Sequence, residues 1–181
     1  MTAIKRKALV LDASAFIAGF DPLSVNDRQY SVPRVGEELF PNSLPSVRFN
    51  TAVEGGRLRV RAPSTSFLEK VEEASKKVGD VLLSKADRQV LALALELKDE
   101  GYDPRIVTDD YSIQNVANLV GVEFASLMTF GIRYRLYWIK YCPACHRKYP
   151  SDYKHKHCEV CGTEVKRRPL KRKPVRKQGK R

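Results

Sequence analysis

Several residue types and patterns are scarce in this chain of 181 residues, and each scarcity excludes a class of protein. No apolar run approaches the roughly 20 residues that cross a bilayer. Residues 1–7 lead directly into a strand pattern instead of the apolar segment of a signal peptide. Neither GxxxxGKS/T nor GxGxxG occurs, which argues against nucleotide-binding folds of those types. We therefore expect a cytoplasmic protein with no membrane partner.

Histidine and cysteine are both few and confined to the C-terminal part of the chain. The three histidines are His146, His155 and His157, so no histidine is available as a catalytic base in residues 1–130. All four cysteines lie within residues 142–161. Such clustering indicates one local site and not a disulfide framework.

Acidic residues become rare after residue 130, and the net charge of +12 is therefore unevenly placed. Residues 1–130 hold 16 Lys and Arg against 18 Asp and Glu, a balance of −2, whereas residues 131–181 hold 17 against 3, a balance of +14. The length suits one sizeable core with a small appendage. This charge distribution indicates that residues 1–130 form the part that performs the chemistry and that the basic residues 131–181 bind a polyanion.

Apolar strands alternate with helical patterns through the first 130 residues. Strands are predicted near residues 8–11, 30–32, 58–62, 105–108 and 122–125, and helices from residues 13, 33, 44, 64, 84 and 111. Residues 20–29 are predicted to be a loop, and Asp103-Pro104 a turn. This alternation predicts an α/β fold with a parallel sheet flanked by helices.

Five acidic residues occupy strand ends or helix starts in this arrangement: Asp12, Glu38, Asp87, Asp109 and Asp110. Each has a structural alternative. Asp12 is a suitable N-cap, Glu38 in a first turn interacts favourably with the helix dipole, and Asp87 stands where a capping box has Glu or Gln. Asp109 and Asp110 share one strand-to-helix junction, where only one of them can be the cap. Right-handed crossovers nevertheless bring all these positions to one edge of the sheet.

Carboxylates that meet at one edge repel one another unless cations are present. Ligation by oxygen alone suits Mg²⁺ or Mn²⁺, which also bind phosphate oxygens and activate water. The acidic set therefore indicates hydrolysis of a phosphodiester.

The stretches around these residues, residues 11–14, 32–39, 84–87 and 108–115, resemble the four acidic motifs of PIN-domain nucleases. A PIN domain followed by four cysteines is similar to the archaeal Nob-one family, endoribonucleases that mature the 3′ end of small-subunit rRNA. The resemblance implies that Asp12, Glu38, Asp87 and Asp109 or Asp110 bind the catalytic metal, with Ser14 and Thr108 as polar neighbours. It also implies three partners: precursor rRNA, the small ribosomal subunit and a KH-domain assembly factor.

Two CxxC pairs, Cys142 with Cys145 and Cys158 with Cys161, predict a zinc ribbon over residues 131–165 that follows a PIN-like domain over residues 5–130. Four thiolates fill the tetrahedral shell of Zn²⁺, so the site is expected to be structural. Disulfides, which a reducing cytosol disfavours, and replacement of a cysteine by His146 or His157 are the alternatives.

Cations alternate with aromatic residues around the cysteines, a pattern that suits RNA. The aromatic side chains could equally form the small core of the ribbon. Residues 166–181 are predicted to be a basic disordered tail, either binding RNA or merely solvated. The candidate RNA-binding residues are Arg133, Arg135, Lys140, Lys166, Arg167, Arg168, Lys171 and Arg172.

The sequence predicts one function and leaves two alternatives. The first is a metal-dependent endoribonuclease that cleaves single-stranded precursor rRNA at the 3′ end of 16S rRNA. The second is a non-catalytic RNA-binding adaptor on the pre-ribosome. The third is a toxin-type PIN ribonuclease, which typically lacks a zinc ribbon.

Overall fold

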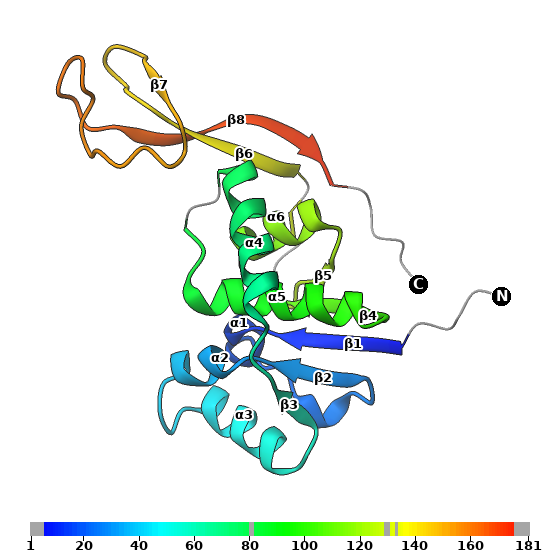
Figure 1. Ribbon diagram of the computed structural model, residues 1–181. Coiled ribbons are helices and arrows are strands. Elements are labelled where there is room, and N and C mark those ends of the chain that lie inside the picture. The colour runs from blue at the N-terminus through cyan, green and yellow to red at the C-terminus, as the bar shows by residue number, and fades with distance from the viewer. Residues whose placement is uncertain (1–5, 80–81, 129–130, 133, 176–181) are drawn as a thin grey trace.

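A five-stranded parallel sheet forms the centre of the computed structural model, which describes residues 6–79, 82–128, 131–132 and 134–175. The strand order is β3-β2-β1-β4-β5 (Figure 1). The strands are β1 (Arg6–Leu11), β2 (Arg28–Ser31), β3 (Leu58–Val60), β4 (Tyr102–Val107) and β5 (Glu123–Ala125). The predicted parallel α/β fold is confirmed.

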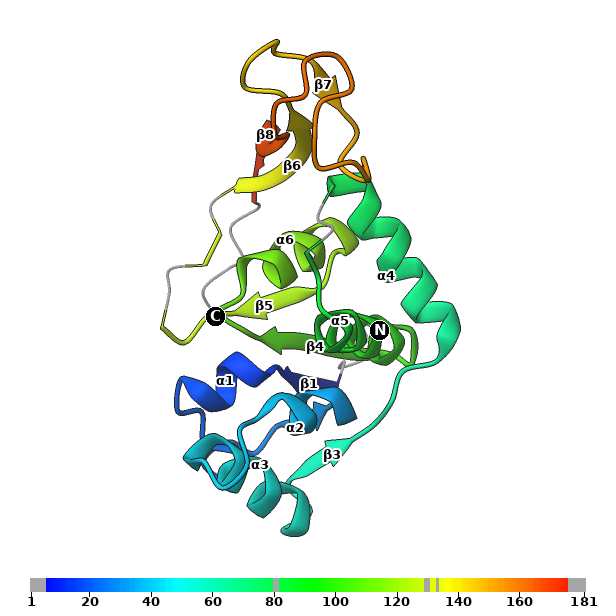
Figure 2. The same ribbon diagram turned by 90° about the vertical axis from the view of Figure 1, so that its left-hand side faces the viewer.

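Six helices and one short 3-10 helix connect these strands. They are α1 (Ala13–Ile17), η1 (Pro22–Ser24), α2 (Pro33–Glu38), α3 (Leu44–Glu54), α4 (Thr65–Val78), α5 (Lys85–Asp99) and α6 (Tyr111–Val120). Helix α1 contacts α2 and α3, whereas α4, α5 and α6 contact one another (Figure 2). Helix α2 of the first group also contacts α5 of the second. Because crossovers between parallel strands are right-handed, the first group covers one face of the sheet and the second group the other.

The core lies between the sheet and its helices. Val10 and Leu11 of β1 and Ile106 of β4 are fully buried, and α5 contributes an almost continuous buried surface that includes Leu91, Leu93 and Leu97. Helix α5 contacts β1 and β4 directly. The middle of the sheet is therefore a rigid support for residues that follow β1 and β4.

The strand order reverses direction at β1, which lies between β2 and β4. The chain leaves β1 into α1 on one face and leaves β4 into α6 on the other. In open parallel sheets, ligands bind beyond the carboxyl ends of the strands at such a switch point. Asp12 follows β1 there, and Asp109 and Asp110 follow β4.

Two local predictions differ from the structure. Asp103 and Pro104 lie inside β4 instead of forming a turn, and Pro104 is in register with Ala8. The ladder to β5 begins only at Arg105, so the missing N–H of Pro104 falls near the end of the sheet, where it is tolerated. Residues 20–29 also contain η1 and the start of β2.

A second sheet, with strand order β7-β6-β8, follows the parallel one. Its strands are β6 (Tyr134–Tyr141), β7 (Lys148–Tyr149) and β8 (Lys166–Pro174). The prediction of a disordered tail is wrong for residues 166–174, because β8 pairs with β6 along its whole length. Residues 176–181 lie outside the described part of the chain.

The second sheet is attached to the first domain through α6 and the end of α4. The side chain of Asn115 on α6 donates to the carbonyl oxygen of Leu136 and accepts from its amide, at 2.9 and 2.8 Å. Arg167 donates to the carbonyl oxygen of Gly79 at 3.2 Å. Gly79 ends α4 with φ of +68°, and a Cβ there would collide with the carbonyl oxygen of Trp138. No helix in the described residues is long and apolar enough to cross a membrane.

Candidate active site and metal centre

Asp12 is the buried centre of the acidic site, with 4% of its surface exposed. Its Oδ2 accepts hydrogen bonds from the hydroxyl of Ser14 at 2.7 Å, the hydroxyl of Thr108 at 2.9 Å and the amide of Ser14 at 3.4 Å. The described residues donate no hydrogen bond to Oδ1. Asp12 therefore caps α1 with Oδ2, and Oδ1 is the oxygen that could hold a cation. The structure places the hydroxyls of Ser14 and Thr108 beside Asp12.

Asp109 and Asp110 have different surroundings, although they are adjacent. Asp110 is the N-cap of α6, and its Oδ1 accepts from the amides of Ser112 and Ile113 at 2.6 and 3.4 Å. The carboxylate of Asp109 accepts instead from the amides of Leu127 and Met128, each at 3.1 Å. Asp110 is exposed and close enough to raise the pKa of Asp87. Of the two, Asp110 is thus the residue whose charge acts on Asp87.

Asp87 lies in the first turn of α5, where it takes part in capping the helix and also belongs to the acidic site. Its Oδ2 accepts from the amide of Ser84 at 2.7 Å, and the hydroxyl of Ser84 accepts from the amide of Asp87 at 3.1 Å, which completes a capping box. Burial raises the pKa of Asp87, and the charges of Asp12 and Asp110 raise it further. The capping role and the acidic cluster are therefore compatible.

Glu38 lies at the end of α2, on the rim of the same site. Partial burial raises its pKa, and the charges of Asp87 and Asp12 add to this effect. Glu37, one residue earlier, is exposed and pairs with Arg34 at 2.9 Å. Glu38, and not Glu37, is therefore the residue of this pair on which the charges of Asp87 and Asp12 act.

The four carboxylates of Asp12, Glu38, Asp87 and Asp110 come from four different elements. Burial and the charges of acidic neighbours raise the pKa values of Glu38 and Asp87. This electrostatic strain is what a divalent cation would relieve, and the hard oxygen donors fit Mg²⁺ or Mn²⁺. No three of these oxygens lie within 4.8 Å of one another in the described residues. Such spacing leaves room for the water ligands that Mg²⁺ usually keeps.

The four cysteines do converge, because all four sulfur atoms lie within 4.8 Å of one another. The Sγ atoms of Cys142 and Cys161 are 3.4 Å apart and those of Cys145 and Cys158 are 3.5 Å apart, so no disulfide joins them. Tetrahedral Zn²⁺ with bonds of about 2.3 Å requires similar separations. The hydroxyl of Tyr149, 2.9 Å from Cys158 Sγ, lowers the pKa of that thiol to about 6. The thiols are thus arranged to bind zinc.

The predicted RNA-binding residues divide into two groups. Lys166, Lys171 and Arg172 are exposed on β8, although Lys171 and Arg172 also lie over tyrosine rings, whereas four others are partly buried and have partners within the chain. Lys140 donates to the carbonyl oxygen of Tyr153 at 2.6 Å, and Arg135 to that of Asn118 at 3.3 Å. Arg167 bonds to Gly79, as described above, and Arg168 lies over the ring of Tyr141. Arg133 lies outside the described residues.

Sequence reasoning missed the roles of Gln114 and Asn115. Gln114 is fully buried, donates to the carbonyl oxygen of Thr108 at 3.0 Å and accepts from the amide of Ile132 at 2.9 Å. Asn115 binds β6, as described above. The available signal was their polar type on the buried side of an otherwise apolar helix, where an amide requires partners.

The fold and the acidic site define a PIN-domain ribonuclease, and the family described as "PIN domain of ribonuclease" matches residues 9–97. Endoribonuclease Nob1 of Methanothermobacter thermautotrophicus is 38% identical over 160 residues, which cover 88% of this chain and 91% of the relative. Endoribonuclease Nob1 of Methanocaldococcus jannaschii is 37% identical over 96% of this chain and 84% of its own length. The chain belongs to the Nob1 family of endoribonucleases.

A relative with another name is about as similar to this chain as the two Nob1 proteins are. Ribonuclease VapC1 of Thermoplasma acidophilum is 37% identical over 173 residues, which cover 92% of this chain and 85% of the relative. The match is longer than the PIN domain, so it includes the cysteine-containing part of the chain. All these relatives carry ribonuclease names, which agrees with the class of the site.

Proposed function

We propose that this endoribonuclease uses bound Mg²⁺ or Mn²⁺ to cleave single-stranded precursor rRNA at the 3′ end of 16S rRNA. The observation that supports the metal dependence is that Asp12 and Asp110 follow the carboxyl ends of β1 and β4, and that their charges act on Asp87, as those of Asp87 and Asp12 act on Glu38. The choice of RNA rests on the resemblance of the acidic motifs and the cysteine pairs to the Nob1 family.

Each residue of the acidic site has a part in this chemistry. The four carboxylates would hold the cation, while Ser14 and Thr108 orient the carboxylate of Asp12 through its Oδ2. The bound ion would activate water and neutralise the leaving oxygen. The water oxygen bonds to phosphorus as the bond from phosphorus to O3′ breaks, and the proton lost by water balances the one gained by O3′. The products are a 5′-phosphate and a 3′-hydroxyl.

The cysteine site is proposed to hold one structural Zn²⁺. Four thiolates leave no coordination position for a substrate or a catalytic water. Its function in this proposal is to fix the hairpin that carries β6 and β8. Their basic residues, from Arg135 to Arg172, would then contact rRNA or the small ribosomal subunit, and Arg133 is proposed to do the same. A KH-domain assembly factor is a further proposed partner, and the proposed location is the cytoplasm.

The experiment compares an RNA that spans the 3′ boundary of 16S rRNA with a shuffled RNA of equal length. The zinc-loaded full-length chain is expected to cut the first RNA at one position when Mn²⁺ or Mg²⁺ is added. Asp12→Asn should abolish cutting and leave RNA binding unchanged. Asp21→Asn is the matched control, because Asp21 caps η1 outside the acidic site. Cutting by Asp12→Asn, or cutting without divalent ions, would contradict the proposal.

The similarity of this chain to Ribonuclease VapC1 keeps a second class of RNA substrate open. A toxin-type enzyme would cut tRNA or mRNA in the same assay at least as fast as the boundary RNA. An adaptor would cut none of them, and its biological effect would survive Asp12→Asn. The comparison of substrates at equal concentration therefore separates all three functions.

A further inference from the structure

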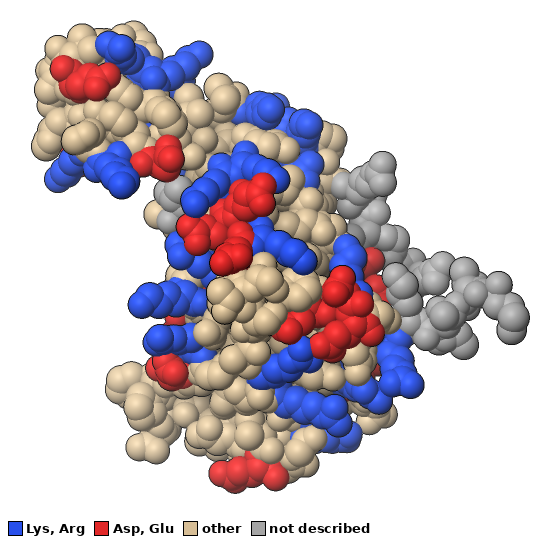
Figure 3. Space-filling model, in the orientation of Figure 1, with Lys and Arg blue, Asp and Glu red and all other residues tan. Residues whose placement is uncertain are grey.

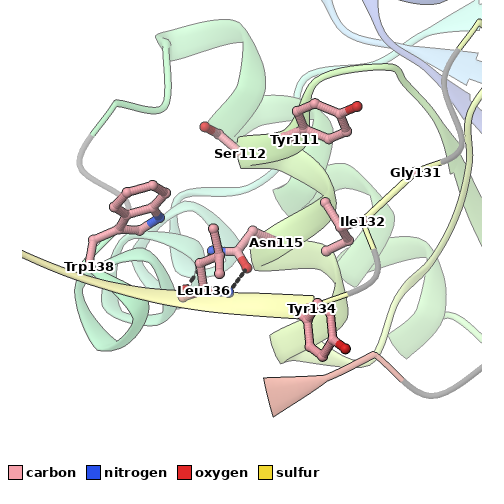
Figure 4. Close-up of a pocket in the computed structure, with 8 residues that line it drawn as sticks. All are labelled: Tyr111, Ser112, Asn115, Gly131, Ile132, Tyr134, Leu136 and Trp138. Carbon is pink, nitrogen blue, oxygen red and sulfur yellow. Dashed lines mark hydrogen bonds between the residues drawn. The ribbon is translucent and has the colours of Figure 1, made fainter. Parts of the chain in front are cut away.

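A cavity of about 440 Å³ lies between α6 and β6, next to the acidic site. Figure 4 shows its walls: residues of the first turns of α6 on one side, alternate residues of β6 on the other, and the segment before β6 at one end. The lining residues are Tyr111, Ser112, Asn115, Gly131, Ile132, Tyr134, Leu136 and Trp138. The proposed function leaves this cavity without a role.

We propose that this cavity is a nucleobase pocket that holds one unstacked base of the RNA strand beside the scissile phosphate. The proposal deepens the function proposed above and rests on it for the identity of the strand. Its substrate-binding residues are Tyr111, Tyr134 and Trp138.

The chemistry of the lining favours a base over a phosphate. Five of the eight lining residues are apolar or aromatic, and none is a cation or a carboxylate. Aromatic rings stack on any base, because every base has a π-face. The side chain of Asn115 is already engaged by Leu136, so it holds the wall in place instead of reading the ligand.

Cations lie beside the rings of the pocket, where the backbone of a bound nucleotide would pass. Arg167 lies over the ring of Trp138 at 4.1 Å, and Arg172 lies over that of Tyr134 at 5.0 Å. The excess of positive charge beyond residue 130 favours a polyanion over a protein partner at this place. Aromatic surface flanked by cations is the usual composition of a site for single-stranded RNA.

The pocket begins one residue after a carboxylate of the acidic site. Tyr111 follows Asp110, the N-cap of α6, and its side chain is 56% exposed. A base that stacks in the pocket therefore places its own sugar and phosphate next to Asp110. This proximity makes the pocket a determinant of where the strand is cut.

Trp138 allows a direct test, because it is the single tryptophan of the chain. The Asp12→Asn variant, loaded with zinc, is titrated with a short single-stranded RNA, and the fluorescence of Trp138 is followed together with the anisotropy of labelled RNA. Binding is expected to quench Trp138. The same RNA with one abasic nucleotide near the cleavage position should bind about 5- to 150-fold more weakly, the range for loss of one stacked base.

Cleavage by otherwise wild-type enzyme gives the second measurement. Tyr134→Leu should lower kcat/KM for the intact RNA and have no further effect on the abasic RNA, because both changes remove the same contact. Tyr102→Leu is the matched control. Tyr102 lies under Arg28 in the same kind of cation–π pair, on β4 and at the opposite end of the sheet.

The outcomes separate the two proposals. The pocket proposal would be contradicted if RNA bound without any change in the fluorescence of Trp138. It would also be contradicted if abasic and intact RNA bound with equal affinity wherever the abasic nucleotide was placed. Quenching that depends on the base, in an enzyme that cuts no RNA, would support the pocket and contradict the proposed function.

Discussion

At the scale of single residues, the acidic site is built from side chains that already have a structural task. Asp12, Asp87 and Asp110 each cap a helix, and Asp12 is held by two hydroxyls as well. A carboxylate that accepts helical amides is oriented before any cation binds. Pre-orientation of this kind lowers the cost of binding, because few rotamers remain to be lost.

The adjacent pair Asp109 and Asp110 gives the first prediction. Asparagine caps helices as well as aspartate does, so Asp110→Asn should keep its fold and lose the charge that the metal requires. We expect kcat/KM to fall by about 100-fold or more, which corresponds to the several kcal/mol that metal-assisted catalysis supplies. Asp109→Asn should retain most activity, since its carboxylate faces Leu127 and Met128. Equal losses in the two variants would contradict this assignment.

Glu38 gives a prediction about pH. Burial and the neighbouring charges raise its pKa above the ordinary value of 4.5. Above pH 4.5 the unfolded chain releases this proton first, so the metal-free wild type should lose stability relative to Glu38→Gln as pH rises through the folded-state pKa. Below pH 4.5 this loss of stability relative to Glu38→Gln should vanish. Thermal unfolding between pH 4 and 8 measures it, with Glu37→Gln as the control.

Added Mn²⁺ should make the wild type more stable than Glu38→Gln near neutral pH, the reverse of the order in the metal-free proteins. A bound cation favours the ionised carboxylate, so the wild type should gain more in Tm than Glu38→Gln does. Equal gains in both proteins would show that Glu38 does not contribute to the cation site.

At the scale of elements, the strands that carry the chemistry were predictable, because their signals are local. The apolar run that ends in Asp12 and the Thr-Asp-Asp junction after residue 107 are visible in the sequence alone. Their convergence follows from the handedness of parallel crossovers. The division of roles between Asp109 and Asp110 was not predictable, since it depends on a loop near residue 127 that is distant in the sequence.

Strand β8 shows why the rest could not be predicted. Its residues are mostly Lys and Arg, which suggests disorder when the segment is considered alone. Backbone pairing with β6 does not depend on side-chain charge, and the aromatic rings of β6 provide faces for the cations of β8. Arg168 lies 4.5 Å from the ring centre of Tyr141, and Lys171 lies 4.7 Å from that of Tyr137. These contacts exist only after the two strands meet.

A truncation tests this strand. Removal of residues 166–181 should expose one edge of β6, lower the Tm and weaken zinc retention, because eight register pairs between β6 and β8 are lost. Removal of residues 176–181 alone is the control and should leave both properties unchanged. Calorimetry and zinc content measure the two effects. Equal behaviour of the two truncations would contradict the role of β8.

At the scale of the whole molecule, the excess positive charge and the acidic site lie in different parts of the chain. Figure 3 shows acidic and basic side chains mixed over the helices of the PIN domain on the visible face. The part beyond residue 130 has a balance of +14. Such a distribution lets the C-terminal part bind the RNA backbone while the acidic site, which repels phosphates in the absence of metal, acts on one bond.

The salt dependence of RNA binding follows from this separation. Each phosphate neutralised on a single strand contributes about −0.7 to the slope of log K against log salt concentration. Lys171→Ala and Arg172→Ala should each reduce the slope by about that amount, because both side chains are exposed. Arg105→Ala, whose guanidinium pairs with Glu123 at 2.7 Å, should leave it unchanged. Unaltered slopes in the β8 variants would place the RNA elsewhere.

The most direct measurement of metal catalysis by the carboxylate cluster uses an RNA with sulfur in place of a non-bridging oxygen at the scissile phosphate. The zinc-loaded enzyme should cut this RNA slowly with Mg²⁺, and Mn²⁺ should restore the cleavage rate, because Mn²⁺ binds a sulfur ligand more readily than Mg²⁺ does. Asp12→Asn should show no cleavage with either ion. Equal cleavage of the oxygen and sulfur substrates in Mg²⁺, persisting in Asp12→Asn, would contradict a metal ion held by these four side chains.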